Sequence, residues 1–486
     1  MNKLSNTINV ESKKKLTENG ALSFSEANNP IITLFGQAGS LRNRTEEEIK
    51  KLFDEAYAYN AQLAVKMLFY IGDIRGGLGE RRTFRICLRR LATINPILVV
   101  MNMDNIRAYN RYDSYYYLIG TPCEDIMWEY LLNQWIMDIQ AMNEGKKCTL
   151  LAKWLKSPRV SNKTHKKWAA MTAEHFYLTE AIYRKTLSKL RKYINVVETK
   201  MSSKEWDKIN YENVPALAMV KYYGAFNTHD EERFNKYLYD VKIGYKKMNM
   251  SVTHPYEIVR KILNNSTYNE TLKLAWDNLP QLKDNSNVLC FCDVSPSMAW
   301  DGERPLASSL GLGIYFAQQN KGAFHNQLLT FSTTPKFIQF KDSDNIYDCI
   351  KRVNTSNWGS TNLYAAFHKL IDIAVQNYIL QEDMPEAIIV ISDNEIDEFN
   401  RTNNIDDFYS TIYKLFTNNN YTPPKIIFMN VEARQTTFLT LNENCLFISG
   451  NSVSSFPILL NNLSYKVMEM IEDLLMGPRY RQVVIP

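Results

Sequence analysis

The sequence has no long apolar segment and few cysteines, and both scarcities exclude classes of protein. No run of about 18 apolar residues is present, which argues against a membrane-spanning helix. Residues 1–20 contain no apolar core of signal-peptide length, and the sequence carries no CaaX end and no myristoylation motif. Its 7 cysteines are odd in number and scattered, which fits neither a disulfide framework nor a zinc site. We therefore expect a cytoplasmic protein in a reducing compartment with no membrane partner.

The composition is that of a globular protein whose charge is unevenly distributed. The chain has 486 residues, 45% of them hydrophobic and 22% charged, which suggests two to four domains of roughly 100–200 residues. The net charge of +5 hides a division. Residues 1–284 hold 43 basic and 31 acidic residues, whereas residues 285–486 hold 14 and 21. The basic half is suited to a polyanion and the acidic half to a cation, so we expect two domains with different partners.

The first half of the chain has the apolar periodicity of helices. Thr45 followed by three glutamates is a helix-start signature, and an apolar pattern close to 3.6 residues continues to Phe69. Further helices are predicted at 80–94, 97–108, 112–118, 124–142, 165–174, 177–194, 203–209, 213–222, 229–247 and 254–264. Their short connections favour stacked helical hairpins. The polar residues 1–30 are interpreted as a mobile or loosely docked arm.

The pattern changes near residue 280, where short apolar runs begin to alternate with helices. The predicted strands begin at Val288, Gln327, Ala387, Lys425 and Asn444. The predicted helices between and after them span 304–319, 343–353, 362–378, 405–417 and 456–475. Strands that are apolar throughout predict a parallel sheet covered on both faces. We therefore expect an all-helical domain over 31–279 followed by a doubly wound, Rossmann-like α/β domain over 285–486.

Oxygen-bearing side chains follow the predicted strands at the edge where such sheets bind ligands. Asp293, Ser295 and Ser297 follow the first strand of the α/β half, and Asp393 follows the strand that begins at Ala387. Thr361 stands in the loop before a predicted helix. Carboxylates and hydroxyls that converge at one edge form an all-oxygen site, which suits Mg²⁺ best and also Ca²⁺ or Mn²⁺.

These five residues resemble the metal-ion-dependent adhesion site of von Willebrand A domains. The motif of that family is Asp-x-Ser-x-Ser, then a Thr, then an Asp, and all five places are filled here. The resemblance implies that Ser295, Ser297 and Thr361 are direct ligands in some states. It implies that Asp293 and Asp393 bind the metal directly or through water. The alternative is a von Willebrand A scaffold whose site is vestigial.

The densest positive charge of the chain lies at 151–200, with 12 basic residues against 3 acidic ones. Trp154, Trp168 and Tyr193 are interleaved with the charges, a combination suited to phosphate contacts and base stacking. The candidate RNA-binding residues of this basic band are Lys153, Lys156, Arg159, Lys163, Lys166, Lys167, Arg184, Lys185, Lys189, Arg191 and Lys192. A solvated helix face is the alternative explanation of such a charge run.

The glycine-rich segment from Gly72 to Arg82 lacks the Gly-Lys-Ser/Thr of a nucleotide-binding loop. It lies between two predicted helices, so we interpret it as a tight turn whose glycines take positive φ. Its arginines Arg75, Arg81 and Arg82 are alternative phosphate contacts.

Three stretches of the helical half resemble the TROVE module of the Ro ribonucleoprotein family. They are Asp73-Ile-Arg-Gly-Gly-Leu-Gly-Glu-Arg, Tyr112-Asp113, and Val196-Val-Glu-Thr-Lys-Met-Ser-Ser-Lys-Glu-Trp. In that family a HEAT-like ring precedes a von Willebrand A domain, in the order expected here. The pattern is most similar to an uncharacterised TROVE-like family, from about residue 30 to 480. The resemblance implies binding of small structured RNAs on a basic surface and of single-stranded ends in a central hole.

We therefore expect a non-enzymatic RNA-binding protein, a ribonucleoprotein component, whose α/β domain binds a divalent cation. The cation would accept a carboxylate from an acidic protein ligand or, as a lesser alternative, an RNA phosphate. The alternative function is a metal-dependent protein–protein adaptor without RNA. An enzyme ranks third, because neither a nucleophile–base arrangement nor a two-metal carboxylate cluster is evident. The oligomeric state is left open.

Overall fold

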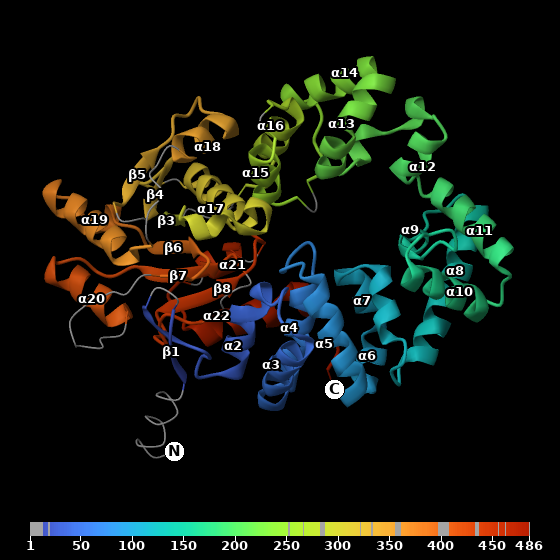
Figure 1. The fold of residues 1–486 in the computed structure, drawn as a ribbon, viewed down its shortest axis with the longest axis horizontal. Coiled ribbons are helices and arrows are strands. Elements are labelled where there is room, and N and C mark those ends of the chain that lie inside the picture. The colour runs from blue at the N-terminus through green and yellow to red at the C-terminus, as the bar shows by residue number, and fades with distance from the viewer. Residues whose placement is uncertain are drawn as a thin grey trace.

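The helical half of the chain forms a long arc, and the α/β half joins its two ends (Figure 1). The computed structural model describes residues 13–17, 20–250, 253–265, 267–281, 287–320, 322–331, 334–354, 361–396, 408–432, 437–454, 456–461 and 463–485. The helices of the arc are α2 Pro30–Gln37, η1 Ala38–Ser40, α3 Glu46–Tyr59, α4 Ala61–Gly72, α5 Arg81–Ile94, α6 Pro96–Met101, α7 Met103–Tyr109, η2 Tyr112–Leu118, α8 Glu124–Asn143, α9 Leu151–Trp154, α10 Lys163–His175, α11 Glu180–Tyr193, α12 Val197–Ser202, η3 Trp206–Lys208, η4 Tyr211–Asn213, α13 Ala216–His229, α14 Glu231–Lys242, α15 Pro255–Leu263 and α16 Glu270–Asp277. In the described part of the chain, no helix is both long enough and apolar enough to span a bilayer.

Local capping explains where the first helices begin and end. The Thr45 hydroxyl accepts from the Glu48 amide at 3.3 Å, and the Glu48 carboxylate accepts from the Thr45 amide at 2.9 Å, which confirms the predicted helix start. The apolar pattern that continues to Phe69 is nevertheless divided between two helices. Asn60 takes an extended conformation and caps α4 through the Leu63 amide at 3.0 Å. Periodicity alone does not reveal this break.

The α/β half is a doubly wound sheet in its described residues. Its elements are β3 Val288–Asp293, η5 Pro296–Ala299, α17 Trp300–Gln319, β4 Gln327–Phe331, β5 Lys336–Gln339, α18 Ile346–Asn354, α19 Leu363–Gln376, η6 Gln381–Asp383, β6 Ala387–Ser392, α20 Phe408–Asn418, β7 Lys425–Asn430, β8 Cys445–Ser449, α21 Phe456–Asn461, α22 Val467–Met476 and η7 Pro478–Tyr480. The strand order is β5-β4-β3-β6-β7-β8, parallel except for β5 at the edge. The strand order reverses between β3 and β6, because β4 and β5 lie on one side of this pair and β7 and β8 on the other. The carboxyl ends of β3 and β6 are therefore the expected ligand-binding edge.

The alternation of side chains along the strands separates two cores. In β3, Cys290 and Cys292 belong to the core that contains α17 and continues into the arc. Leu289 and Phe291 face the second core, which α19 and α20 cover. The five predicted strands are therefore confirmed, and helices cover both faces, but the last predicted helix, 456–475, is divided into α21 and α22. Sequence patterns did not predict β5, a four-residue edge strand that lies partly exposed and lacks an apolar run.

The N-terminal segment packs onto the α/β half in its described part. The strands β1 Lys14–Leu16 and β2 Leu22–Phe24 form a hairpin, and Phe24 exchanges two backbone hydrogen bonds with Phe438. Ala21 and Phe24 are buried in the core beneath α19 and α20. This part of the arm expected at 1–30 is therefore docked rather than mobile, and residues 1–12 lie outside the described residues.

The C-terminal segment packs back onto the turn between α4 and α5. Asp73 is fully buried, and its carboxylate accepts hydrogen bonds from the Arg479 guanidinium and, at 3.0 Å, from the Tyr480 hydroxyl. The segment 73–80 is the predicted inter-helix turn, and Gly79 takes the predicted positive φ of +67°. Gly76 has another role, because a Cβ atom there would collide with Arg479. The glycine-rich turn thus accommodates the C-terminal arginine.

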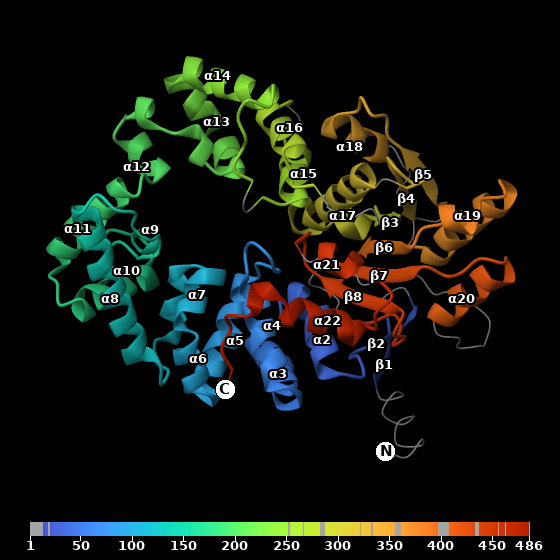
Figure 2. The same cartoon turned by 180° about the vertical axis from the view of Figure 1, so that it is seen from behind.

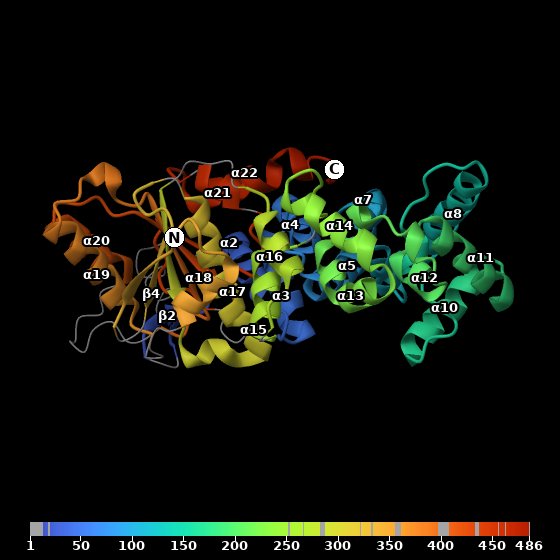
Figure 3. The ribbon, with the colours of Figure 1, turned by 90° about the horizontal axis from the view of Figure 1, so that it is seen from above.

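The α/β half closes the arc at both ends. Figure 2 shows α2 and α4 beside α22 and β8 at one end, and α15 returning to α17 at the other. Seen from above, the helices and the sheet lie side by side in a flat, elongated molecule (Figure 3). The two halves share one continuous core that runs from Ile31 to Val483. The inner side of the arc therefore has a fixed geometry set by both halves.

We expect Asp73→Asn to lower the free energy of unfolding by about 2 kcal/mol, because the fully buried carboxylate loses its charge-assisted hydrogen bonds from the half-exposed Arg479 and from Tyr480. Denaturant unfolding measures this loss. The matched control is Lys51→Gln, which removes an exposed ion pair with Glu55 at 3.6 Å and should cost less than about 0.5 kcal/mol. Equal effects of the two substitutions would contradict the role given to Asp73.

Candidate functional site

Two groups of side chains stand out, and the first lies at the carboxyl ends of β3 and β6. Asp293 ends β3, and Asp393 follows β6, its parallel neighbour. Both carboxylates are buried, with exposed fractions of 0% and 1%. Thr361 reaches the same edge, because its hydroxyl donates to the Glu395 carbonyl oxygen at 2.5 Å. The structure therefore gathers residues that are a hundred positions apart in the sequence.

Hydrogen bonds within this cluster orient its oxygen atoms. The Asp293 carboxylate accepts from the Ser295 amide at 2.9 Å, and the Ser295 and Ser297 hydroxyls lie 2.9 Å apart. The Ser392 hydroxyl donates to Asp293 at 2.7 Å and lies 3.5 Å from Asp393. Ser392 thus lies between the two carboxylates. Sequence reasoning missed Ser392, although its position as the last residue of β6 was a usable signal.

The two carboxylates are not balanced by a basic side chain. Burial, and then the charge of Asp393, raise the pKa of Asp293 well above its usual range. Among the described residues neither carboxylate forms an ion pair with lysine, arginine or histidine, and no group of three or more His, Cys, Asp or Glu side chains is placed to hold a metal. A cation here would have two carboxylates and three hydroxyls as donors. This oxygen-only donor set fits a hard divalent cation.

The turn after β6 depends on one residue in the left-handed region. Asn394 has φ +66°, its amide donates to the Ser392 hydroxyl at 3.1 Å, and its side chain donates to the Thr437 carbonyl oxygen. The turn lets the Glu395 amide donate to Asp393 at 3.1 Å. Asparagine tolerates this conformation, and a β-branched residue would not. Residues 355–360 of the loop before Thr361 lie outside the described residues.

The second group lines a cavity of about 830 Å³ on the inner side of the arc. We call it the arginine cavity, because seven basic side chains line it against three glutamates among the described residues. The basic residues are Arg42, Arg81, Arg82, Arg85, Arg111, Lys153 and Arg304, and the glutamates are Glu46, Glu80 and Glu257. They come from the approach to α3 and its first residue, the start of α5, the approach to η2, α9, α15 and α17, so both halves of the molecule build this cavity.

A single carboxylate fixes several of these cations. Asp113 pairs with Arg85 at 2.8 Å, Arg111 at 2.6 Å and Lys156 at 3.3 Å. Burial alone would raise the pKa of Asp113, but the hydrogen bond from Arg111 and the surrounding positive charges hold it at about 2. Burial, and then the charges of Arg111 and Arg85, lower the pKa of Arg81. The local charge therefore stays positive after Asp113 has been counted.

Aromatic rings lie beside the cations of the cavity. The Arg111 guanidinium lies 3.9 Å from the ring centre of Trp154, and that of Arg85 lies 4.8 Å from Tyr117. The Arg304 guanidinium lies 5.5 Å from the ring centre of Tyr256. Arginine planes and aromatic faces are the surfaces on which nucleobases stack. The cavity therefore offers phosphate contacts and stacking faces together.

The predicted basic band is divided by the structure. Lys153 lines the arginine cavity, and Lys156 pairs with Asp113 instead of facing outward. Arg191 donates to the carbonyl oxygens of Ala152 and Leu155 at 2.9 and 2.8 Å, so it holds α9 against α11. The other eight residues lie at or near the surface of the segment from 159 to α11. They are Arg159, Lys163, Lys166, Lys167, Arg184, Lys185, Lys189 and Lys192.

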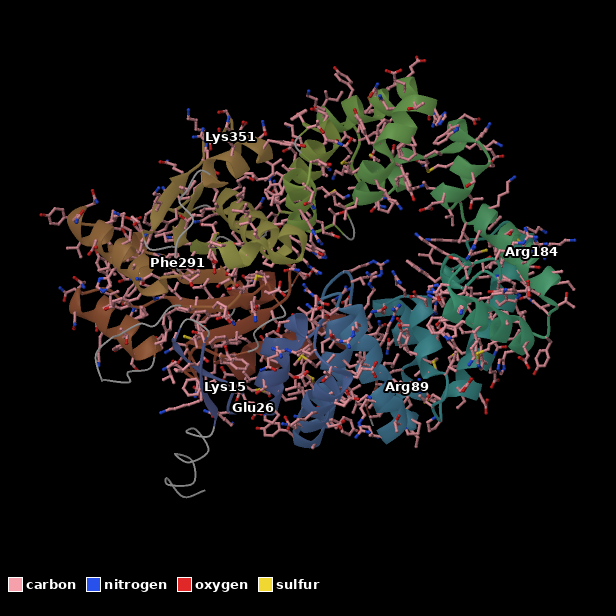
Figure 4. The ribbon with its side chains drawn as sticks, in the orientation of Figure 1. Lys15, Glu26, Arg89, Arg184, Phe291 and Lys351 are labelled. Carbon is pink, nitrogen blue, oxygen red and sulfur yellow. The ribbon has the colours of Figure 1, made fainter. Side chains whose placement is uncertain are left out.

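The outer part of the band does not reach the cavity lining. Figure 4 places Arg184 on α11 at the outer side of the arc, away from its centre. Of the turn arginines, Arg81 and Arg82 line the cavity. The sequence signal for the cavity was weak, because its cations are spread from Arg42 to Arg304 and form no local run.

Comparisons with known proteins give related sequences of undefined function. Residues 17–114 and 145–285 match a family described as a domain of unknown function, DUF2828, and residues 287–474 match another, DUF7788. The uncharacterized protein L728 of Acanthamoeba polyphaga mimivirus is 24% identical over 499 residues, covering 94% of this chain and 86% of that protein. The crystal structure of the Deinococcus radiodurans Ro (RSR) protein is 11% identical with a TM-score of 0.35, covering 93% of this chain and 94% of that one.

We expect Asp113→Asn to destabilise the protein by about 2–3 kcal/mol at pH 7. The folded protein lowers the pKa of Asp113 from its ordinary value of 3.8 to about 2, so the stabilisation is present above about pH 4 and is lost as the pH falls through about 2. Urea unfolding at pH 7 and near pH 3 should therefore show a smaller difference from the wild type at the lower pH. The exposed control Asp207→Asn should change stability by less than about 0.5 kcal/mol at both pH values. A pH-independent loss in Asp113→Asn would argue against the ion pairs.

Proposed function

We propose that the protein is a non-enzymatic RNA-binding protein that holds single-stranded RNA in the arginine cavity. The observation that carries this proposal is the cavity itself, where seven basic side chains and the rings of Tyr117, Trp154 and Tyr256 line one space. The phosphates of the RNA would pair with the cations, and its bases would stack on the rings and guanidinium planes. The TROVE-like motifs support the same function, because Asp73, Arg81 and Asp113 all belong to them.

The cavity suits single strands better than duplexes. Its lining comes from the inner side of a closed arc, and its volume of about 830 Å³ accommodates a few nucleotides, not a double helix. Unstacked bases can reach Trp154, which a paired base cannot do. The exposed cations of the outer band, such as Lys166 and Lys185, would add weaker contacts to a structured part of the same RNA.

For the α/β half we propose a von Willebrand A domain whose metal-ion-dependent adhesion site holds a divalent cation, Mg²⁺ in the first place. Asp293, Ser295, Ser297, Thr361 and Asp393 would hold it. Two buried carboxylates that have no basic partner among the described residues support this proposal, since a cation would remove their mutual repulsion. When bound, the cation supplies an open coordination position for an oxygen ligand.

An adaptor function without RNA is the second candidate. It rests on the cation site alone, where the Ser297 side chain is partly exposed while both carboxylates are buried. A carboxylate of an acidic protein partner would approach from the side of the serine hydroxyls. In this case the arginine cavity would not contribute to binding.

RNA binding should be weakened about tenfold by the double substitution Arg81→Gln with Lys153→Gln, because two cations leave the cavity. Fluorescence anisotropy with a single-stranded RNA of about 12 nucleotides, between about 50 and 200 mM salt, measures the affinity and its salt slope. The matched control, Lys166→Gln with Lys185→Gln, removes the same charge from the outer band and should cost less than about threefold. If the control loses as much affinity, the band carries the binding. If the wild type shows no salt-dependent RNA binding, the proposed function is wrong.

Millimolar Mg²⁺ should raise the melting temperature of the wild type relative to EDTA, because a ligand that binds only the folded state stabilises it. Asp293→Ala and Asp393→Ala should each abolish this shift, whereas Asp372→Asn, an exposed carboxyl on α19, should keep it. Differential scanning fluorimetry measures all three variants. Retention of the full shift in Asp293→Ala would rule out the proposed cation site.

A further inference from the structure

We infer that the arginine cavity recognises a nucleoside 5′-triphosphate group, with the nucleoside on Trp154, and that an RNA strand therefore enters this site by its 5′ end. The inference rests on the proposed RNA-binding function and specifies its ligand. A triphosphate of the same chemistry could also be a free nucleotide, and the experiment below separates these two sources.

The cavity gathers more positive charge in one place than the backbone of a single-stranded RNA would neutralise. Of the three glutamates, Glu80 is paired with Arg42 at 2.7 Å. Glu257 is held by the backbone of α15, where its carboxylate accepts from the His254 amide at 3.0 Å. Among the described residues neither forms an ion pair with Arg81, although the charges of Glu80 and Asp113 partly offset those of Arg111 and Arg85 around it. A single strand brings one charge per nucleotide, whereas a triphosphate brings three phosphates in a row. The second arrangement matches a cluster of cations around one point.

The start of α5 adds backbone donors at the same place. Residues 79–82 line the cavity, and α5 is a 14-residue helix whose N-cap residue, Glu80, makes no side-chain cap hydrogen bond. The amides of the first turn and the positive end of the helix dipole therefore favour an anion there. The guanidinium groups of Arg81 and Arg82 project from this same turn. The Arg82 guanidinium is held at this turn by donating to the Arg44 carbonyl oxygen at 2.8 Å. Guanidinium groups beside a helix start are donors that phosphate oxygens accept.

The cavity continues on the side of α9. A second cavity of about 520 Å³ shares Lys153 and Trp154 with the first and is further lined by Ser188, Arg191 and Thr199. Trp154 thus lines both a strongly basic cavity and a neighbouring one with fewer basic residues. On the opposite side, Arg304, Asn451 and other residues of the α/β half form the wall. A strand whose triphosphate lies among the arginines would place its first base at Trp154 and continue toward α11 and α12.

The test compares three ligands of the wild-type full-length chain in EDTA, so that the cation site does not contribute. They are a single-stranded RNA of about 12 nucleotides with a 5′-triphosphate, the same RNA with a 5′-hydroxyl, and ATP as competitor. We expect the triphosphate RNA to bind about 30-fold more tightly than the hydroxyl RNA. Arg81→Gln should reduce this preference to below about fivefold, and the outer-face control Lys185→Gln should leave it unchanged.

Each outcome separates the inference from the proposed function. Equal affinity for both RNAs, without competition by ATP, would overturn the inference and leave RNA binding intact. Binding of ATP without binding of either RNA would support the triphosphate site and refute the RNA function. If ATP displaces the triphosphate RNA only at ATP concentrations far above that of the RNA, the ligand of the site is an RNA end and not a free nucleotide. Since Arg81 belongs to no ion pair seen in the described residues and lines an open cavity, its substitution should leave the fold intact. Trp154→Leu provides a second variant that should also lower the preference.

Discussion

The architecture depends on the contact between the buried Asp73 carboxylate and the half-exposed Arg479 guanidinium. A carboxylate with no exposure to solvent must be compensated, and Asp73 is compensated by the last described segment of the chain. Lys66 of α4 strengthens the contact by donating to the Tyr480 carbonyl oxygen at 2.7 Å. Because the turn that contains Asp73 leads directly into α5, this contact also sets where Arg81 lies relative to the α/β half. The pair thereby fixes the wall of the cavity and the closure of the arc together.

A second buried carboxylate, that of Asp113, orients cations beside the cavity. Asp113 holds Arg85, Arg111 and Lys156 in place, so these cations are ordered before any ligand arrives. One negative charge orients them without cancelling them. At the edge of the sheet the sign is reversed, because Asp293 and Asp393 lie close together and form no ion pair with a basic side chain in the part of the chain that the structure describes. The charge division of the sequence thus corresponds to two sites of opposite sign, a basic cavity lined mainly by the helical half and an acidic edge of the sheet in the α/β half.

The sequence predicted features that are local and missed those that require distant residues to meet. Buried strands such as Ala387–Ser392 carry their own apolar run, and Asp293, Ser295 and Ser297 share one loop, so both were accessible. The break at Asn60 was missed, because a capping residue inside a regular apolar period does not interrupt that period. The edge strand Lys336–Gln339 was missed, because a half-exposed strand carries no apolar run. The arginine cavity was missed for a different reason. Its cations come from segments that only the closed arc brings together, while the densest local run of charge lies mostly on the outer face.

The central claim is that ligand binds on the inner side of the arc rather than on the outer basic band. Photo-crosslinking of a single-stranded RNA that carries 4-thiouridine near its 5′ end, followed by mass spectrometry of the adducts, tests this claim most directly. The account predicts adducts on peptides that contain Trp154, Tyr117 or Tyr256, which line the cavity. Adducts confined to peptides of α10 and α11 that carry Lys166, Lys167 or Lys185 would contradict it.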